Sequence, residues 1–391
     1  MDLWGSHRID RNWSLVPFQG VSPTVPADIS SLASSGLPIF TIGRNSESRA
    51  LMDLLPISGL ADDFDNSSWQ GLKAFPVTEI PEHAIVISCV SAIYPTTVWN
   101  RMRRAPQTTG LLSYRDLYLA NATVVPVPSY GLTLATYRSN LEKLIWCRQA
   151  VASEGDLETL RAILNFRLSG EAGFLVEVTS KADQQYCHPM LRGPIQTLVD
   201  FGGFDGASAA SLYEFLDKPR NVVIYEPFAR HNAEIQSKFF EEECDVEVRN
   251  LAVSDCEAWG ELGEAGRSSS HFLETLGGSV RQVPLGLEPF PEGLAVWKFD
   301  IEGAELNALR SAREMLKQGD IRLAVSVYHD PADLFLIVEL VSELLPTARI
   351  GFGHYTEGWS ESILYVVADS SLDLVFGDSD AEPPQPRLKA G

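Results

Sequence analysis

A glycine-rich segment near the middle of this chain constrains its fold more than any other feature. Residues 196–199 form an apolar run that predicts a buried parallel strand. Asp200 follows the run, and three glycines then let the backbone turn tightly: Gly202, Gly203 and Gly206. Residues 207–216 carry apolar side chains at helical spacing. The segment therefore predicts a strand, a turn and a helix whose N-terminal amides point at a ligand, as in nucleotide-binding sites.

A second acidic residue narrows the choice of ligand. Residues 222–226 predict the next strand, and its last residue, Glu226, suits the hydroxyls of a ribose. A dinucleotide such as NAD and S-adenosylmethionine both contain a ribose. However, Asp200 and Asp205 in the loop would repel a pyrophosphate and attract the sulfonium and ammonium groups of S-adenosylmethionine. The residues therefore favour S-adenosylmethionine over NAD.

Length and composition exclude several classes of protein. With 391 residues the chain exceeds the usual size of a single hydrophobic core, so two domains are expected. A net charge of -21 disfavours binding to nucleic acid or to anionic membrane surfaces. The sequence has neither an apolar run long enough to span a membrane nor a signal peptide at its start, so a cytoplasmic location is expected. Five scattered cysteines predict neither a disulfide framework nor a zinc site.

The pattern of strands and helices predicts five segments along the chain. Residues 1–35 read as an extended lead-in, 36–105 as a small Rossmann-like α/β domain, 106–190 as a helical connector, 191–370 as the main α/β domain, and 371–391 as a disordered tail. The role of the small domain stays open, because the turn at Gly43 lacks further glycines and suits either an inert domain or a working nucleotide site. Arg44 could receive an anion there.

The main domain is predicted to contain seven strands. Five of them are separated by long crossovers, and the last two, at 348–355 and 362–368, are joined by a short loop. Long crossovers connect parallel strands, and a short loop connects antiparallel ones. The expected fold is therefore a doubly wound parallel sheet that ends in an antiparallel hairpin, which fits the methyltransferase version of the Rossmann fold better than the dehydrogenase version.

Four motifs occur in a familiar order at 199–206, 224–227, 298–305 and 326–330, of which Asp-Ile-Glu-Gly-Ala-Glu at 300–305 is the most specific. Together they resemble the FkbM family of S-adenosylmethionine-dependent methyltransferases over roughly residues 156–368. The resemblance implies a class I methyltransferase fold, S-adenosylmethionine as the cofactor, and O-methylation of a hydroxyl on a sugar, a glycan or a glycosylated natural product.

The resemblance also assigns roles to residues of the cofactor site. It places Asp200, Gly202 and Gly206 in the cofactor loop, Glu226 at the ribose, and Ala252 at the border of the adenine. Gly203 and Asp205 of the same loop are two further candidate cofactor-binding residues.

Three residues are candidates for catalysis. A hydroxyl acceptor must lose its proton, which requires a general base or a metal ion that lowers the hydroxyl pKa. Asp300 and Glu302 follow the predicted fourth strand at the edge of the sheet where ligands bind. His329 follows the fifth strand, and an ordinary histidine pKa near 6.5 would make it a base or, with Asp300, a ligand for a divalent metal.

Two other functions remain open at this stage. One is an NAD(P)-dependent oxidoreductase, and the other is a non-catalytic protein that uses a methyltransferase-like domain for assembly. The expected partners are a small-molecule or glycan acceptor and, if an apolar sheet edge is exposed, a second copy of the chain.

Overall fold

The computed structural model describes residues 4–18, 25–26, 28–104, 108–264, 270–275, 278–289, 293–318 and 320–368. The chain forms two compact units. The first contains Met1–Ser139, Arg161–Thr179 and Thr356–Ser360, and the second contains Asn140–Leu160, Ser180–Tyr355 and Glu361–Gly391. The predicted connector at 106–190 is thus divided between the two units, and the predicted tail at 371–391 lies outside the described residues.

The first unit is built on a five-stranded, fully parallel sheet. Its strands, in spatial order, are β5 (Ala74–Phe75), β4 (Ile57–Ala61), β3 (Ile39–Ile42), β6 (Ala84–Ser88) and β7 (Thr108–Ser113). Helices α2 (Ser46–Leu54), α3 (Pro95–Arg104) and α4 (Tyr114–Ala120) alternate with them along the chain. The strand order reverses direction between β3 and β6, and such a reversal opens a crevice at the carboxyl ends of the strands.

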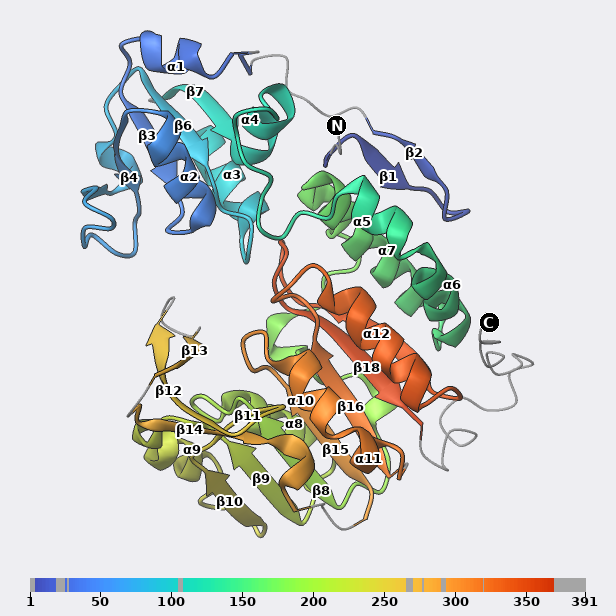
Figure 1. The fold of residues 1–391 in the computed structure, drawn as a ribbon. Helices are drawn as coiled ribbons and strands as arrows, with labels where there is room; N and C mark the ends of the chain where they lie inside the picture. The colour runs from blue at the N-terminus through green and yellow to red at the C-terminus, as the bar shows by residue number, and fades with distance from the viewer. Residues whose placement is uncertain are drawn as a thin grey trace. The chain divides into compact units, whose positions relative to one another are not determined.

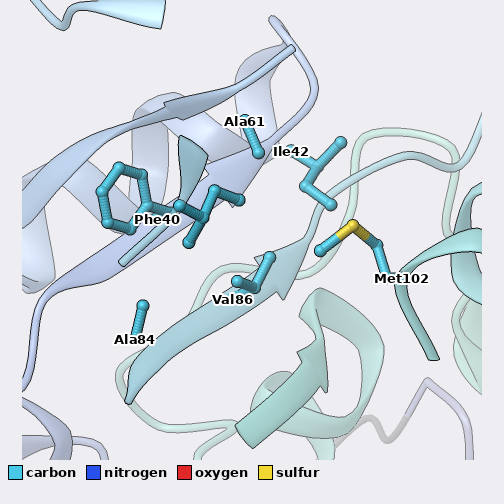
Figure 2. Packing of buried hydrophobic residues seen from close by; sticks show 7 residues of the cluster. Phe40, Ile42, Ala61, Ala84, Val86 and Met102 are labelled. Carbon is cyan, nitrogen blue, oxygen red and sulfur yellow. The ribbon is translucent and has the colours of Figure 1, made fainter. Parts of the chain in front are cut away.

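The core of the first unit packs beneath this sheet (Figure 2). Phe40, Ile42 and Val86 come from neighbouring central strands and meet Ala61 from β4. Met102 reaches the same cluster from α3 and is 1% exposed. Every residue of β3 and of β6 is buried, as expected for strands that are covered on both faces.

Two further parts complete the first unit. The predicted lead-in contains an antiparallel ribbon of β1 (His7–Ile9) and β2 (Leu15–Pro17), followed by the short helix α1 (Ser30–Ser34). The loop 356–360, which joins the last two strands of the chain, packs on the segment after β6. There the amide of Trp359 donates to the carbonyl of Ser91 at 2.9 Å. Helix α5 (Leu134–Ser139) also belongs to this unit.

The second unit contains the predicted seven-stranded sheet (Figure 1). Its spatial order is β10 (Asp245–Arg249), β9 (Asn221–Tyr225), β8 (Thr197–Phe201), β15 (Ala295–Phe299), β16 (Ile321–Ser326), β18 (Ser362–Val367) and β17 (Arg349–His354). Strand β18 runs antiparallel to both of its neighbours, β16 and β17, and the other six strands of this sheet run in the same direction. The predicted parallel sheet with a terminal antiparallel hairpin is therefore confirmed.

Helices connect the strands of this sheet. They are α8 (Ala207–Phe215), α9 (Asn232–Lys238), α10 (Glu305–Ser311), α11 (Arg313–Leu316) and α12 (Asp333–Leu344), with α6 (Leu141–Ala150) from earlier in the chain. Helix α7 (Glu154–Ser169) begins in the second unit and ends in the first. In the part of the chain that is described, no helix is long and apolar enough to cross a membrane.

A small four-stranded sheet in the second unit was not predicted. It consists of β11 (Ala252–Ser254), β14 (Val280–Pro284), β12 (Ala258–Glu264) and β13 (Ser270–Glu274), and β12 and β13 protrude as a hairpin (Figure 1). The third predicted strand of the main domain, over 246–253, is present as β10 but ends earlier, because the chain leaves the main sheet after Arg249 and Ala252 begins a strand that pairs with β14.

Candidate functional site

A cavity of about 570 Å³ lies at the carboxyl ends of the central strands of the second unit. Its walls come from the residues that follow β8, β9 and β15, together with residues from the small sheet and from the start of β18. This is the edge at which doubly wound sheets bind ligands. The volume is within the range of about 300 to 1,000 Å³ that is typical of small-molecule pockets.

The glycine turn after β8 forms one wall of the cavity and depends on the absence of side chains. Gly202 has φ of +89°, and a Cβ there would overlap the carbonyl oxygen of Asp300. Gly206 has φ of +81° and precedes the first residue of α8. Gly203 lines the cavity beside Gly202, while Gly206 is set back against Ile235 of α9. The turn therefore brings bare backbone close to a ligand.

The structure places Asp200 away from the glycine turn itself. It lies inside β8 rather than in the loop, is fully buried, and does not line the cavity. The neighbouring strand places Lys298 directly opposite, and Lys298 Nζ lies 2.7 Å from Asp200 Oδ1. The charge of Asp200 is thus compensated within the protein. Asp205 does line the cavity, and its side chain accepts the amide of Ala207 at 2.9 Å.

Glu226 faces the cavity from the end of β9 and is only 5% exposed. Its two carboxylate oxygens accept backbone amides from the surrounding loops, Phe204 at 2.8 Å and Phe228 at 2.9 Å. His231 Nδ1 lies 3.2 Å from Oε1. A carboxylate has about four acceptor positions, so this orientation leaves capacity for ligand hydroxyls. Ala252 lines another part of the same cavity, beside Leu251.

Two tyrosines hold Asp300 at the opposite wall. Tyr186 donates its hydroxyl to Asp300 Oδ2 at 2.8 Å, and Tyr328 donates to Oδ1 at 3.1 Å. The Tyr328 hydroxyl also lies 3.3 Å from Glu361 Oε1, and the side-chain amide of Gln185 donates to the other oxygen of Glu361. Asp300 and Glu361 both line the cavity, as does Glu302. The structure therefore gathers three carboxylates at one wall.

His329 lies behind these acids rather than in the wall of the cavity. Its Nδ1 is 2.9 Å from Glu305, and its Nε2 is 3.4 Å from Glu302 and 3.6 Å from Asp300. Burial alone would lower the pKa of His329, but the carboxylates outweigh burial and hold this pKa well above its ordinary value. The pKa of His329 is thus higher than the ordinary value on which its predicted role as a base depends.

The wall that contains Asp300, Glu302 and Glu361 carries more negative charge than the nearby cations compensate. Burial, and then the charge of Asp300, raise the pKa of Glu361 to about 7. Burial, and then the charge of Glu305, raise the pKa of nearby Asp333 to about 7. Across the whole cavity, five carboxylates face two permanent cations: Asp205, Glu226, Asp300, Glu302 and Glu361 against Arg230 and Lys298. Such a lining attracts a cationic ligand and repels an anionic one.

Three residues at and behind this wall form a candidate set of metal ligands. Asp300, Glu305 and His329 each offer one ligand atom, and these atoms lie within 4.8 Å of one another. Oxygen and imidazole ligands in this combination suit several divalent cations. Glu305 is already occupied by backbone amides, since Ile301 donates at 2.8 Å and Gly303 at 3.0 Å.

Several residues of the site were not found from the sequence as functional residues. Lys298 and Tyr328 lie within the motifs at 298–305 and 326–330, whereas Tyr186 lies outside all four motifs. Glu361 and Gln185 carry no local signal, because each reaches the cavity only through the folding of the sheet. The positive φ of Glu361, 59°, belongs to the structure and is not readable from the residue type.

The strand order and the antiparallel β18 define the sheet of a Rossmann-like, class I methyltransferase fold. The structure is similar to the methyltransferase FkbM from Methylobacillus flagellatus KT, with 20% identity, a TM-score of 0.64, and coverage of 88% of this chain and 94% of that chain. This similarity confirms the expected resemblance at the level of the fold.

Two other solved structures are more distant. An rRNA methylase from Streptococcus thermophilus has 11% identity and a TM-score of 0.32, covering 49% of this chain and 98% of its own. An O-methyltransferase from Bacillus cereus, solved with SAH, has 13% identity and a TM-score of 0.28, covering 63% of this chain and 94% of its own. No protein-family model matches the chain, and no curated protein matches it in sequence.

Proposed function

We propose that the second unit is an S-adenosylmethionine-dependent methyltransferase that methylates a hydroxyl group of a sugar, a glycan or a glycosylated natural product. One observation carries the proposal. A buried acid at the end of β9, Glu226, and a group of acids after β15 face the same cavity beside a glycine turn. The similarity of the fold to the FkbM methyltransferase supports the same reading.

The residues present fit the proposed cofactor. Glu226 can still accept hydrogen bonds from the ribose hydroxyls of the cofactor. Ala252 lines the cavity and would contact the adenine. The absence of side chains at Gly202 and Gly203 would let the amino-acid part of the cofactor approach the backbone closely. Asp205 adds negative charge at that wall. When bound, this cofactor supplies a methyl group activated by a positively charged sulfur. The excess of carboxylates in the lining favours such a cation over a pyrophosphate.

The remaining chemistry falls to the acids and tyrosines at the opposite wall. Asp300 and Glu302 would orient the acceptor by accepting hydrogen bonds from its hydroxyls, and Tyr186 fixes Asp300 in place. Glu361 would take the proton from the reacting hydroxyl. A general base works best when its pKa is near the working pH, and the pKa of Glu361 is close to neutral. His329 would hold Glu302 and Glu305 in position as a cation.

A divalent cation is the alternative way to activate the acceptor. Asp300, Glu305 and His329 would hold it, and its charge would lower the pKa of an acceptor hydroxyl. The two routes predict different responses to chelators. An activity that survives EDTA supports Glu361 as the proton acceptor, whereas a loss that Mg²⁺ or Mn²⁺ restores supports the metal.

Calorimetric titration of the full-length protein with S-adenosylmethionine, S-adenosylhomocysteine and NAD tests the cofactor. We expect the first two to bind, and Glu226→Gln to weaken binding by roughly tenfold or more, because it removes the charge that accepts the ribose hydroxyls. Glu234→Gln, an exposed residue on the nearby helix α9, is the matched control and should leave affinity unchanged. Binding of NAD alone would favour an oxidoreductase, and binding of neither would favour a non-catalytic assembly protein.

Transfer of a labelled methyl group to a panel of glycans and glycosylated small molecules tests the reaction. Glu361→Gln should keep cofactor affinity and lose about 100-fold in kcat, the lower range for a lost general base. Exposed Glu241→Gln, in the same unit, should not change kcat. Unchanged turnover in Glu361→Gln would remove Glu361 from the mechanism.

A further inference from the structure

The first unit contains a second cavity, of about 540 Å³, at the carboxyl ends of β3, β6 and β7. Its lining includes Glu47 from the first turn of α2, the segment 88–91 after β6, and the segment 113–116 after β7. This is the point at which the strand order of the five-stranded sheet reverses. Open parallel sheets bind ligands at this point, so the position of the cavity is that of a binding site.

The cavity is not a dinucleotide site. Arg44, which the sequence offered as an anion receptor, is engaged by Asp62 at 2.9 Å and by Asp65 at 3.3 Å. Asp62 lies just after β4, which is where a dinucleotide-binding sheet has the acidic residue that binds the ribose hydroxyls. The ion pair with Arg44 neutralises the charge of this carboxylate. The side chain of Asn45 accepts the amide of Ser48 at 3.0 Å and so occupies the start of α2.

The polar groups in the cavity disfavour anions. Glu47 is 4% exposed, and Oε1 accepts the amide and the hydroxyl of Ser129 at 3.1 and 3.2 Å. Among the described residues, no lysine, arginine or histidine forms an ion pair with Glu47. Arg115 is the cation of the lining, and it is shared between Asp116 at 2.9 Å and Glu171 at 3.8 Å. Three carboxylates and one guanidinium leave the cavity negative, which repels phosphate.

Aromatic side chains supply the other walls. Trp99 is half-buried and lines the cavity, and Tyr130 lies between Phe166 and Trp359 with ring-centroid distances of 5.7 and 6.1 Å. Rigid aromatic walls with a few fixed polar groups are typical of small-molecule sites. The C–H faces of a sugar ring pack on such rings, and its hydroxyls donate to carboxylates and accept from a guanidinium.

Cys89 is the cysteine of this lining, and its surroundings disfavour a role as a covalent nucleophile. Burial raises the pKa of the Cys89 thiol to about 12, and the charge of Glu47 adds to the rise. The thiolate is the reactive form, so this cysteine is inert at neutral pH. The chemistry of the lining is therefore that of reversible binding.

From these observations we propose that the cavity binds a neutral, polyhydroxylated ring, either a free sugar or the ribose of a nucleoside. Buried Glu47 and Arg115 hydrogen-bond the ring hydroxyls, and Trp99 packs against the ring face. A phosphate ester of the same ring binds more weakly because of the negative lining. This inference goes beyond methyl transfer and does not depend on it.

The test is calorimetric titration of the full-length protein with neutral hexoses, deoxyhexoses and the four ribonucleosides, each beside its phosphate ester. We expect a neutral member to bind with a Kd below about 1 mM and its phosphate ester to bind roughly tenfold or more weakly. Hydrogen exchange should show protection of segments 88–91 and 113–116 on binding. Binding by hexoses only identifies a free sugar, and binding by nucleosides only identifies the ribose.

Two variants test whether the ligand binds in this cavity rather than elsewhere on the protein. Glu47→Gln should weaken binding about tenfold, because it removes a charged acceptor, and the exposed Glu82→Gln is the matched control with unchanged affinity. Trp99→Ala, at a half-buried position, should also weaken binding and covers the case in which Glu47→Gln fails to fold. The proposal is overturned if no neutral member binds, if phosphate esters bind equally well, or if neither variant changes the affinity.

Discussion

The buried ion pair between Asp200 and Lys298 gives the sharpest quantitative prediction. The two residues lie opposite each other on β8 and β15, with Lys298 Nζ 2.7 Å from Asp200 Oδ1. Their side chains are 0% and 2% exposed. Lys298 also donates to the carbonyl of Gly202 at 2.8 Å and so supports the glycine turn. Replacing Lys298 with methionine keeps most of the side-chain volume and removes the charge.

The expected magnitude follows from burial and distance. At 2.7 Å and an effective dielectric constant of about 20, the gross attraction is about 6 kcal/mol, much of which offsets desolvation. Removing one partner leaves a buried charge, so Lys298→Met should lower the free energy of unfolding of the sheet by about 3 to 5 kcal/mol. Adding Asp200→Asn removes the uncompensated charge, so the double variant should recover about 2 kcal/mol or more.

Native-state hydrogen exchange on the full-length protein is the assay, because it reports β8 and β15 separately from the first unit. Lys317→Met, which breaks a surface pair with Glu314, is the control and should cost less than about 1 kcal/mol. The reasoning is refuted if Lys298→Met costs no more than this control, or if the double variant is less stable than Lys298→Met alone.

Two further predictions concern the glycine turn at Gly202 and the hydrogen bonds through which Asp156 holds the edge strand β17. Gly202→Ala should abolish measurable binding of S-adenosylmethionine and lower the melting temperature, because its Cβ would overlap the carbonyl of Asp300; Gly110→Ala, where a Cβ meets open space, should do neither. Asp156 accepts hydrogen bonds from Phe352 N at 2.9 Å and from His188 at 3.1 Å; burial pushes its pKa up, but these bonds outweigh burial and keep the pKa below its ordinary value. The stabilisation that Asp156 gives to the folded state is therefore complete above the unfolded-state pKa of about 3.9. It is lost as the pH falls through the lower pKa that Asp156 has in the folded state. Asp156→Asn should cost about 1 to 3 kcal/mol in urea unfolding at pH 7 and show a smaller loss of stability between about pH 5 and pH 2; an unchanged pH dependence would contradict this.

Most strands of the main sheet could be predicted because they are apolar runs, whereas β10 at the edge of the sheet alternates charged residues with valine. The run before Asp200 and the run before Tyr355 were both placed within a few residues. The small sheet was missed, since β11 has three residues and β12 mixes glycine and glutamate with apolar residues, which leaves no clear periodicity. Strand β7 was missed for a similar reason, because its first three residues are Thr108, Thr109 and Gly110.

The sequence by itself determined the doubly wound sheet, the glycine turn, and the position of Glu226 at the edge where ligands bind. These features depend on local patterns, namely apolar runs, glycines, and an acid at the end of a strand. The tertiary structure decided which charges face a ligand. It paired Asp200 with Lys298, brought Glu361 to the wall of the cavity, and surrounded His329 with carboxylates that raise its pKa. A pKa depends on burial and on charges a few ångströms away in space, and neighbours in space come from distant parts of the chain.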